Sequence, residues 1–300
     1  MSRHRDAGLF FVLSLFWGTA FVAIRAGLES IPPVLFASFR YDLAAVLMLA
    51  YAAYATENWY PRTRADWLTV GVSAVLIIAV YNALLFIGQQ GVTSAVAAIL
   101  IASSPILTTG FSRLFFPDEG LALPGMVGLT LGFVGVFLVA SPEPSTLLTS
   151  ELVAPGLVFL AAVAVALGSV LLQGISRGIS TEGMTAWSFA FGAIMLHLLS
   201  VGLPTESFSS AELTTTGVIS VVYLSVFASA VGYFVYFRLL DRLGAIEINL
   251  VSYAAPVFAA IFGWLLLGET IDLLTVGGFF LIFAGFLLIK RDAIAAEFAR

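Results

Sequence analysis

Long apolar segments separated by short polar connections run through the whole chain of 300 residues. A helix needs about 20 apolar residues to cross the hydrocarbon core of a membrane, and each segment is close to that length. The segments cover roughly residues 8–25, 33–54, 67–88, 92–113, 122–140, 153–174, 183–202, 215–237, 246–267 and 272–290. They do not alternate apolar and polar residues at every second position, as the strands of a transmembrane barrel do. The pattern predicts an all-α integral membrane protein with ten transmembrane helices.

The same pattern returns when the chain is shifted against itself by 150 residues. The matching positions include Gly18 with Gly168, Ser38 with Ser188, Ala95 with Ala245, Glu119 with Glu269, Gly128 with Gly278 and Gly135 with Gly285. Self-similarity at a fixed period predicts two repeats, residues 1–145 and 146–300, with five helices in each. Because five is odd, the second repeat enters the membrane inverted. Inverted repeats are an architecture of secondary transporters, in which the two halves exchange inward-open and outward-open shapes.

The basic residues predict the orientation in the membrane. With the amino terminus in the cytoplasm, the basic residues on the cytoplasmic side are Arg3, Arg5, Arg62, Arg64, Arg113, Arg177, Arg238, Arg242, Lys290, Arg291 and Arg300. Arg25 alone falls outside, and Arg40 lies within a helix. Lysine and arginine are retained on the cytoplasmic side. We therefore expect a cell-membrane protein with both termini in the cytoplasm. An arginine, not a small-residue cleavage site, ends the first apolar run, so we expect that run to be a helix and not a signal peptide.

Composition supports the membrane assignment and excludes several functions. Hydrophobic residues make up 60% of the chain and charged residues 10%, against about 25% charged residues in a soluble domain. The absence of cysteine excludes disulfides and thiolate metal sites, and His4 and His197 are not spaced to hold a metal ion. A net charge of −5 without a basic patch argues against nucleic acid. One lysine stands against twelve arginines, and the sequence assigns no meaning to this imbalance.

The chain lacks the motifs of competing functional classes. It has no nucleotide-binding Gly-x4-Gly-Lys-Ser/Thr loop and no Gly-x-Ser-Gly stretch of a serine hydrolase. We therefore expect no catalytic residues, no metal and no cofactor. A secondary carrier is the favoured class, and a non-transporting receptor or scaffold and an intramembrane enzyme are the alternatives.

Several short motifs resemble those of one transporter family. The first half has Trp17-Gly18, Pro32-Pro33, Phe39-Arg40, Thr93-Ser94-Ala95, Pro105, Glu119, Gly128 and Gly135, and the second half has Leu243-Gly244-Ala245, Pro256, Gly268-Glu269, Gly278 and Gly285. They resemble the pattern of EamA-type members of the drug/metabolite transporter superfamily over nearly the whole chain. The resemblance implies a ten-helix carrier with cytoplasmic termini that exports or exchanges small metabolites, amino acids or drugs. The chain departs from the pattern at Ala20 and at Tyr41-Asp42, so Asp42 inherits no role from it.

Two charged residues lie deep in the segment 33–54, where a charge costs at least about 2.5–3.5 kcal/mol. Arg40 and Asp42 are two positions apart and point about 200° away from each other on a helix, so they do not pair. Arg40 either attracts a carboxylate or phosphate of the solute or bonds carbonyls of a neighbouring helix. Asp42 either takes up a coupling proton or bonds a hydroxyl or amide such as that of Asn82. His197 is interpreted as an interhelical hydrogen bond, with proton coupling as the alternative.

Two prolines near mid-depth, Pro105 and Pro256, predict helix breaks at corresponding points of the two repeats. Paired interruptions of this kind point to a binding site, although kinks without ligand contact are the alternative. The residues predicted to bind the solute are Trp17, Arg40, Tyr81, Asn82, Ser103, Ser104, Tyr233 and Tyr253. One arginine, one aspartate and many aromatic residues suit a zwitterionic or weakly charged amphipathic metabolite.

Glycines recur in the segments 122–140 and 272–290 and predict close helix packing. They are Gly125, Gly128, Gly132 and Gly135 in the first segment and Gly277, Gly278 and Gly285 in the second. Packing within one bundle is the favoured interpretation and a homodimer interface the alternative. The expected partners are a small-molecule solute and membrane lipid, with no nucleic acid. Glu119 and Glu269 are interpreted as turn residues, favoured at the positive end of the next helix.

Overall fold

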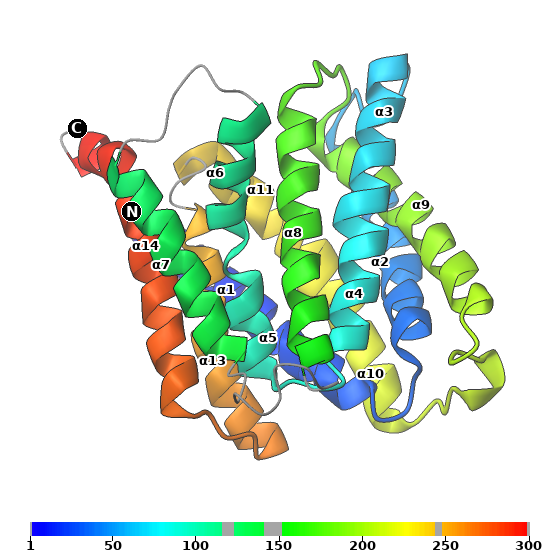
Figure 1. The fold of residues 1–300 in the computed structure, drawn as a ribbon. Helices are drawn as coiled ribbons and strands as arrows, with labels where there is room; N and C mark the ends of the chain where they lie inside the picture. Colours follow the sequence, from blue (N-terminus) through cyan, green and yellow to red (C-terminus); the bar gives the residue numbers. More distant parts are fainter. Residues whose placement is uncertain (1, 116–122, 141–151, 244–247, 299–300) are drawn as a thin grey trace.

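The computed structural model describes residues 2–115, 123–140, 152–243 and 248–298, and all of its regular structure in these ranges is helical (Figure 1). The helices of the first half are α1 Ser2–Gly27, α2 Pro33–Ala55, α3 Arg64–Val72, η1 Ser73–Val80, α4 Tyr81–Gly88, α5 Ser94–Ile101, α6 Ser104–Phe115 and α7 Leu123–Ala140. Those of the second half are α8 Val153–Gln173, α9 Thr181–Gly202, η3 Phe208–Ser210, α10 Thr215–Tyr223, η4 Leu224–Val231, α11 Gly232–Leu243, α13 Val251–Leu267 and α14 Leu273–Phe298. Glu119 lies outside the described residues.

Nine stretches of helix in the described ranges are long and apolar enough to cross a membrane, and α13 is a shorter apolar helix. Three of the nine are assembled from shorter helices: α3, η1 and α4; α5 and α6, which two turn residues separate; and α10, η4 and α11. The nine spans together with α13 fit the predicted ten helices. The all-α membrane fold expected from the apolar pattern is confirmed.

Two π-helical segments lie inside the membrane spans, and the sequence pattern did not predict them. They are η1 and η4, each eight residues long, and they begin at Ser73 and Leu224. These starting points lie 151 residues apart, close to the repeat length of the sequence. π-Helical turns are rare and occur frequently at functional sites. In the cavity described below, η1 contributes the lining residue Ile77, and η4 forms hydrogen bonds with the lining residues Trp17 and Arg40.

The predicted helix breaks differ between the two halves. Pro105 stands at a real interruption, because α5 ends at Ile101 and α6 starts at Ser104. The break predicted at Pro256 is wrong, since α13 continues through this proline. Pro256 is the sixth residue of α13, beyond the first turn, so it leaves the carbonyl of Ser252 without its usual donor although the helix continues. The turn in this region instead lies at Leu250, just before α13.

The helices α7 and α14 pack side by side along one edge of the bundle (Figure 1). Glycines make this approach possible: a Cβ atom on Gly128 would lie 2.6 Å from the carbonyl oxygen of Gly285, and one on Gly135 would lie 2.6 Å from that of Gly278. In the same way, a Cβ atom on Gly285 would lie 2.5 Å from the carbonyl oxygen of Gly128, and one on Gly278 would lie 2.6 Å from that of Gly135. These glycines pack helices together within the chain, as the favoured interpretation of the sequence expected.

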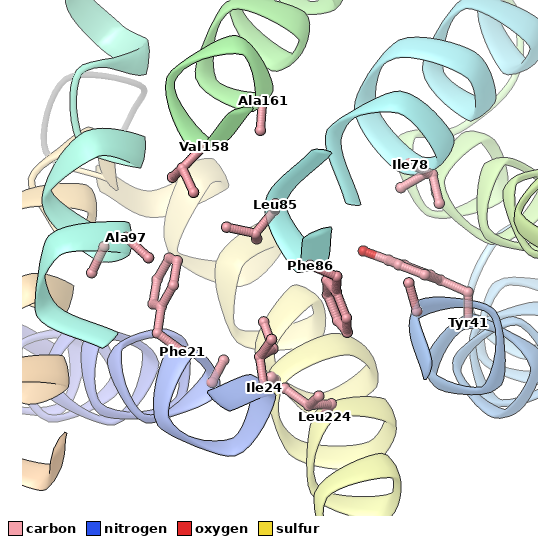
Figure 2. Packing of buried hydrophobic residues seen from close by; sticks show 14 of the residues in the cluster. Phe21, Ile24, Tyr41, Ile78, Leu85, Phe86, Ala97, Val158, Ala161 and Leu224 are labelled. Atoms are coloured by element: carbon pink, nitrogen blue, oxygen red, sulfur yellow. The ribbon is translucent and has the colours of Figure 1, made fainter. Parts of the chain in front are cut away.

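We call the end of the bundle where α1 ends and α2 begins the predicted outer end, and the opposite end the predicted cytoplasmic end. Large apolar side chains from α1, α4 and η4 fill the predicted outer end (Figure 2). Ile24, Leu85, Phe86 and Leu224 each have at most 1% of their surface exposed, and Phe21 has 8%. We call these five residues the outer plug.

Candidate functional site: a central cavity

A cavity of about 430 Å³ lies at the centre of the bundle. Its lining residues come from α1, α2, η1, α4, α5, α6, α8, α11, α13 and α14 and from Ala102 and Asn249, which lie next to the two helix interruptions. Pockets of roughly 300–1,000 Å³ hold small organic molecules. The cavity therefore has the size of a site for a metabolite-sized solute.

Aromatic side chains form one wall of the cavity. The ring of Trp17 lies 5.9 Å from that of Tyr233 and 5.5 Å from that of Tyr236, and Tyr41 and Tyr81 line the same space. The indole of Trp17 donates a hydrogen bond of 3.1 Å to the backbone carbonyl of Ala228 in η4. Rings placed in this way offer an apolar surface to a bound molecule, with hydroxyl groups for polar contact.

Arg40 brings a positive charge into this aromatic space. Its side chain is 8% exposed, and Nε donates a hydrogen bond of 3.1 Å to the hydroxyl of Ser229 in η4. The guanidinium carbon lies 5.0 Å from the centre of the Tyr41 ring. Within the described residues, Arg40 forms no ion pair, and its other guanidinium N–H groups have no hydrogen-bond acceptor. A buried cation is normally paired, so this one has unused capacity for an anion.

The charge of the cavity is one-sided. Arg40 and Lys290 line it, and no aspartate or glutamate belongs to its lining in the described part of the chain. The remaining polar groups are neutral, from residues that include Ser104, Thr108, Thr109, Ser169, Asn249 and Ser252. A site with two cations and no acid favours an anionic guest electrostatically.

Burial of the lining residues changes along the cavity. Phe21, Ile24 and Leu85 belong both to the lining and to the outer plug, and all three are buried. Asn249 and Lys290, near the predicted cytoplasmic end, are partly exposed. The cavity is therefore closed at the predicted outer end and leads toward the predicted cytoplasmic end.

Hydrogen bonds between the two halves of the chain close the predicted outer end. The carboxylate of Glu269, between α13 and α14, accepts bonds of 3.0 and 3.1 Å from the backbone N–H of Ser94 and one of 3.1 Å from its hydroxyl. Glu269 thus caps α5 in the other half, whereas the sequence placed it at the start of the next helix. That position is capped by Asp272, which accepts from the backbone N–H of Thr275 at 2.6 Å.

A second carboxylate joins the halves at this end. Glu206, in the connection after α9, is 8% exposed and accepts bonds of 2.6 and 2.9 Å from the backbone N–H groups of Val34 and Leu35. These N–H groups belong to the first turn of α2, where the positive end of the helix favours a negative charge. Carboxylates from the second half thereby hold the start of α2 and the start of α5 in place.

The cavity brings together part of the predicted binding set. Trp17, Arg40, Tyr81, Ser104 and Tyr233 line it, as does the break residue Pro105. The cavity residues that the prediction missed include Tyr41, Thr108, Thr109, Ser169, Asn249, Ser252 and Lys290. Lys290 carried a signal, since it is the single lysine of the chain.

Three predicted binding residues do not line the cavity. Asn82 is buried and donates to the hydroxyl of Tyr41 at 3.1 Å and to the carbonyl of Ile78 at 2.8 Å, so it positions a cavity tyrosine. Ser103 donates to the carbonyl of Leu100 at 2.6 Å, and Tyr253 packs against the rings of Phe283 and Phe286. Short polar side chains beside a helix break are satisfied locally by freed carbonyls, and composition alone does not reveal this.

Asp42 and His197 form a pair away from the cavity. Nε2 of His197 lies 2.8 Å from Oδ2 of Asp42, linking α2 to α9. The side chains are 35% and 48% exposed for His197 and Asp42, respectively. His197 makes the interhelical hydrogen bond expected of it, but Asp42 is bonded to this imidazole and not to Asn82.

Asp42→Asn is expected to leave solute flux within about twofold of wild type between pH 6 and pH 8. The pair lies outside the cavity, and an asparagine keeps an oxygen that accepts a hydrogen bond from the imidazole. Initial rates in proteoliposomes at several pH values check this. Flux that loses its pH dependence in Asp42→Asn would instead assign proton coupling to the pair.

Comparison with known proteins places the chain among transporters. The profile of the EamA-like transporter family matches residues 7–141 and 153–291. The inner membrane transporter YedA of Escherichia coli K12, itself uncharacterized, is 29% identical over 268 residues, which are 88% of this chain and 84% of YedA. The uncharacterized transporter YvbV of Bacillus subtilis is 26% identical over 301 residues, covering 100% of this chain and 96% of YvbV.

Two further comparisons concern a longer protein and the fold. A WAT1-related, chloroplastic protein of Arabidopsis thaliana is 29% identical over 272 residues, or 88% of this chain. The match spans 64% of the length of that protein. A protein of known crystal structure is 19% identical with a TM-score of 0.63, covering 96% of this chain and 98% of the other. At this identity the likeness supports a shared fold.

Proposed function

Because the chain belongs to the EamA-like transporter family, we propose that it is a secondary transporter for a small amphipathic solute with an anionic group. The observation that carries the proposal is Arg40, a buried cation without an ion-pair partner in the described residues, at the wall of the central cavity. The anionic group would bind the free guanidinium N–H groups. The apolar body would lie against Trp17 and the neighbouring tyrosines.

Burial energetics support a binding role for Arg40. Removing a cation from water costs several kcal/mol, and one hydroxyl from Ser229 replaces only part of its hydration. A carboxylate can take two parallel N–H groups of the guanidinium and so offset that cost. The alternative, bonding to neighbouring carbonyls, has no such contact in the described residues.

The sequence predicted a zwitterionic or weakly charged solute, and the geometry favours a monoanion over a zwitterion. That expectation counted Asp42 as a partner for an amine. Asp42 pairs with His197 outside the cavity lining, and the described lining has no other carboxylate. An amine entering the cavity would have tyrosine rings and neutral groups for partners, next to two cations that repel it.

Three features support alternating access by two inverted repeats, residues 1–145 and 146–300. The α7–α14 contact has the symmetry of two related halves. Gly128 contacts Gly285, and Gly278, the counterpart of Gly128 in the second repeat, contacts Gly135, the counterpart of Gly285 in the first. A two-fold relation between the halves requires this exchange. The π-helices η1 and η4 occupy corresponding positions. Finally, the cavity is closed at one end only, as expected of one state in an exchange between two. With cytoplasmic termini, this state would load solute from the cytoplasm, which fits export or exchange.

A solute panel in proteoliposomes tests the proposal. It comprises labelled aromatic carboxylates, aliphatic carboxylates, amino acids, amines and neutral aromatic alcohols, each with and without a pH gradient. We expect carboxylates with an apolar body to enter faster than into protein-free vesicles, without ATP. If no solute in the panel moves faster than in protein-free vesicles, the proposal fails.

A further inference from the structure

We propose that Lys290 is a second anion-binding residue, which receives the anionic solute at the predicted cytoplasmic end of the cavity before Arg40 holds it. This inference rests on the proposed function and adds an entry site to it. Lys290 belongs to α14, lines the cavity and is partly exposed. In the described residues it has no hydrogen bond and no ion pair. Its ammonium group is therefore free to meet a solute.

The two cations stand at different depths. Helix α2 begins at Pro33 and α14 begins at Leu273, both at the predicted outer end. Arg40 lies seven residues after Pro33, whereas Lys290 lies seventeen residues after Leu273. At 1.5 Å of rise per residue, this ten-residue difference corresponds to about 15 Å along the helices. A single carboxylate does not bridge such a separation. The cations therefore act in succession on a small monoanion, Lys290 nearer the mouth and Arg40 deeper.

Neutral polar groups line the cavity near Lys290. Asn249 and Ser252 flank the turn at Leu250 and line the cavity at the same end as Lys290. An amide and a hydroxyl can donate hydrogen bonds to an anion without adding charge. The absence of acidic residues from the described lining leaves nothing to neutralise Lys290 inside the cavity.

The chemistry of lysine suits an entry site. An arginine presents a rigid fork that holds a carboxylate bidentately, while a lysine is a compact, strongly hydrated point charge on a flexible stem. A transported solute has to leave the mouth again, so a weaker contact is favoured there. Apart from the two histidines, every other basic side chain in this chain belongs to an arginine, and the one lysine lines this cavity.

The competing interpretation is that Lys290 extends toward lipid headgroups at the membrane surface, as lysines near helix ends do. The sequence allows a direct distinction, because Lys290 and the amino terminus are the only primary amines of the chain. Full-length protein in liposomes is treated with a sulfonated acetylating ester, and acetylation of the Lys290 peptide is followed by mass spectrometry. Lys290→Arg, which keeps the charge, identifies the contribution of the amino terminus.

The proposal predicts that benzoate and phenylacetate slow acetylation of Lys290 at least about threefold, whereas the neutral benzyl alcohol does not. Acetylation that is unaffected by the carboxylates but slowed by anionic lipid would assign the lysine to headgroups and overturn the proposal. Acetylation unaffected by either would overturn it as well.

Transport by Lys290→Gln separates this inference from the proposed function. We expect the KM for the transported carboxylate to rise roughly three- to tenfold while Lys290→Arg stays within about twofold of wild type. A wild-type protein that moves no solute refutes the proposed function itself. A wild-type protein that moves carboxylates with the same KM as Lys290→Gln refutes only the entry site.

Discussion

Arg40→Gln is expected to lower kcat/KM for the anionic solute at least about 30-fold. The glutamine keeps hydrogen-bonding capacity but removes the deepest cation of the cavity, where water does not screen the lost interaction. Losing a charged hydrogen-bond partner in a buried site costs about 2–5 kcal/mol, and each 1.4 kcal/mol is a factor of ten. Initial uptake rates in proteoliposomes, at several solute concentrations, measure the effect.

Stability separates a binding role for Arg40 from a structural one. Burial of a cation that binds the solute lowers the stability of the solute-free protein. Arg40→Gln should therefore unfold at the same temperature as wild type or at a higher one. Arg40→Lys keeps the charge but loses the fork, and we expect an intermediate rate. Ser229→Ala removes only the hydroxyl that orients Nε and should cost less than tenfold. An Arg40→Gln protein that retains more than a tenth of wild-type uptake would exclude the binding role.

Gly285→Ala is expected to lower the apparent melting temperature by roughly 5 °C, because extra atoms in a packed interface cost about 1–3 kcal/mol. The added Cβ would lie 2.5 Å from the carbonyl oxygen of Gly128 and 3.0 Å from the amide nitrogen of Gly132. Both are backbone atoms of α7, so the clash is relieved only by moving a helix. Thermal unfolding of purified protein, followed by size-exclusion chromatography, measures the change.

Gly277→Ala is the matched control on the same helix. A Cβ at this position would meet nothing within 4 Å, so the substitution should leave the melting temperature unchanged or raise it slightly. Gly135→Ala, at the repeat mate of Gly285, should be as harmful as Gly285→Ala, since its Cβ would lie 2.6 Å from the carbonyl oxygen of Gly278. Equal stability of Gly285→Ala and Gly277→Ala would show that the α7–α14 contact is wrongly placed.

The apolar pattern was sufficient to predict the helices, because the bilayer imposes one length and one kind of secondary structure on a spanning segment. The finer backbone features were not predictable in the same way. The π-helices η1 and η4 arise within largely apolar stretches that contain no proline or glycine. Pro256 shows the converse, since a residue that usually breaks helices lies inside a continuous one.

The sequence predicted the chemical character of the binding site better than the individual residues that line it. Arg40 and the aromatic residues Trp17, Tyr81 and Tyr233 stand out by type and depth, and the cavity does bring them together. The sequence indicates only an orientation role for Lys290, because the position of this residue in the bundle depends on how α14 packs. The partnership of Asp42 with His197 joins residues 155 positions apart, and helix length alone does not determine which faces of α2 and α9 meet.

Alternating access is the central claim, and the accessibility of one cysteine tests it most directly. The chain has no cysteine, so Ser104→Cys places a single thiol in the cavity beside the break between α5 and α6. The rate of its reaction with a membrane-impermeant thiol reagent is measured in right-side-out and in inside-out vesicles. Alternating access predicts reaction from both sides, with a transported carboxylate slowing both reactions. Reaction from one side only, with or without the carboxylate, would contradict it.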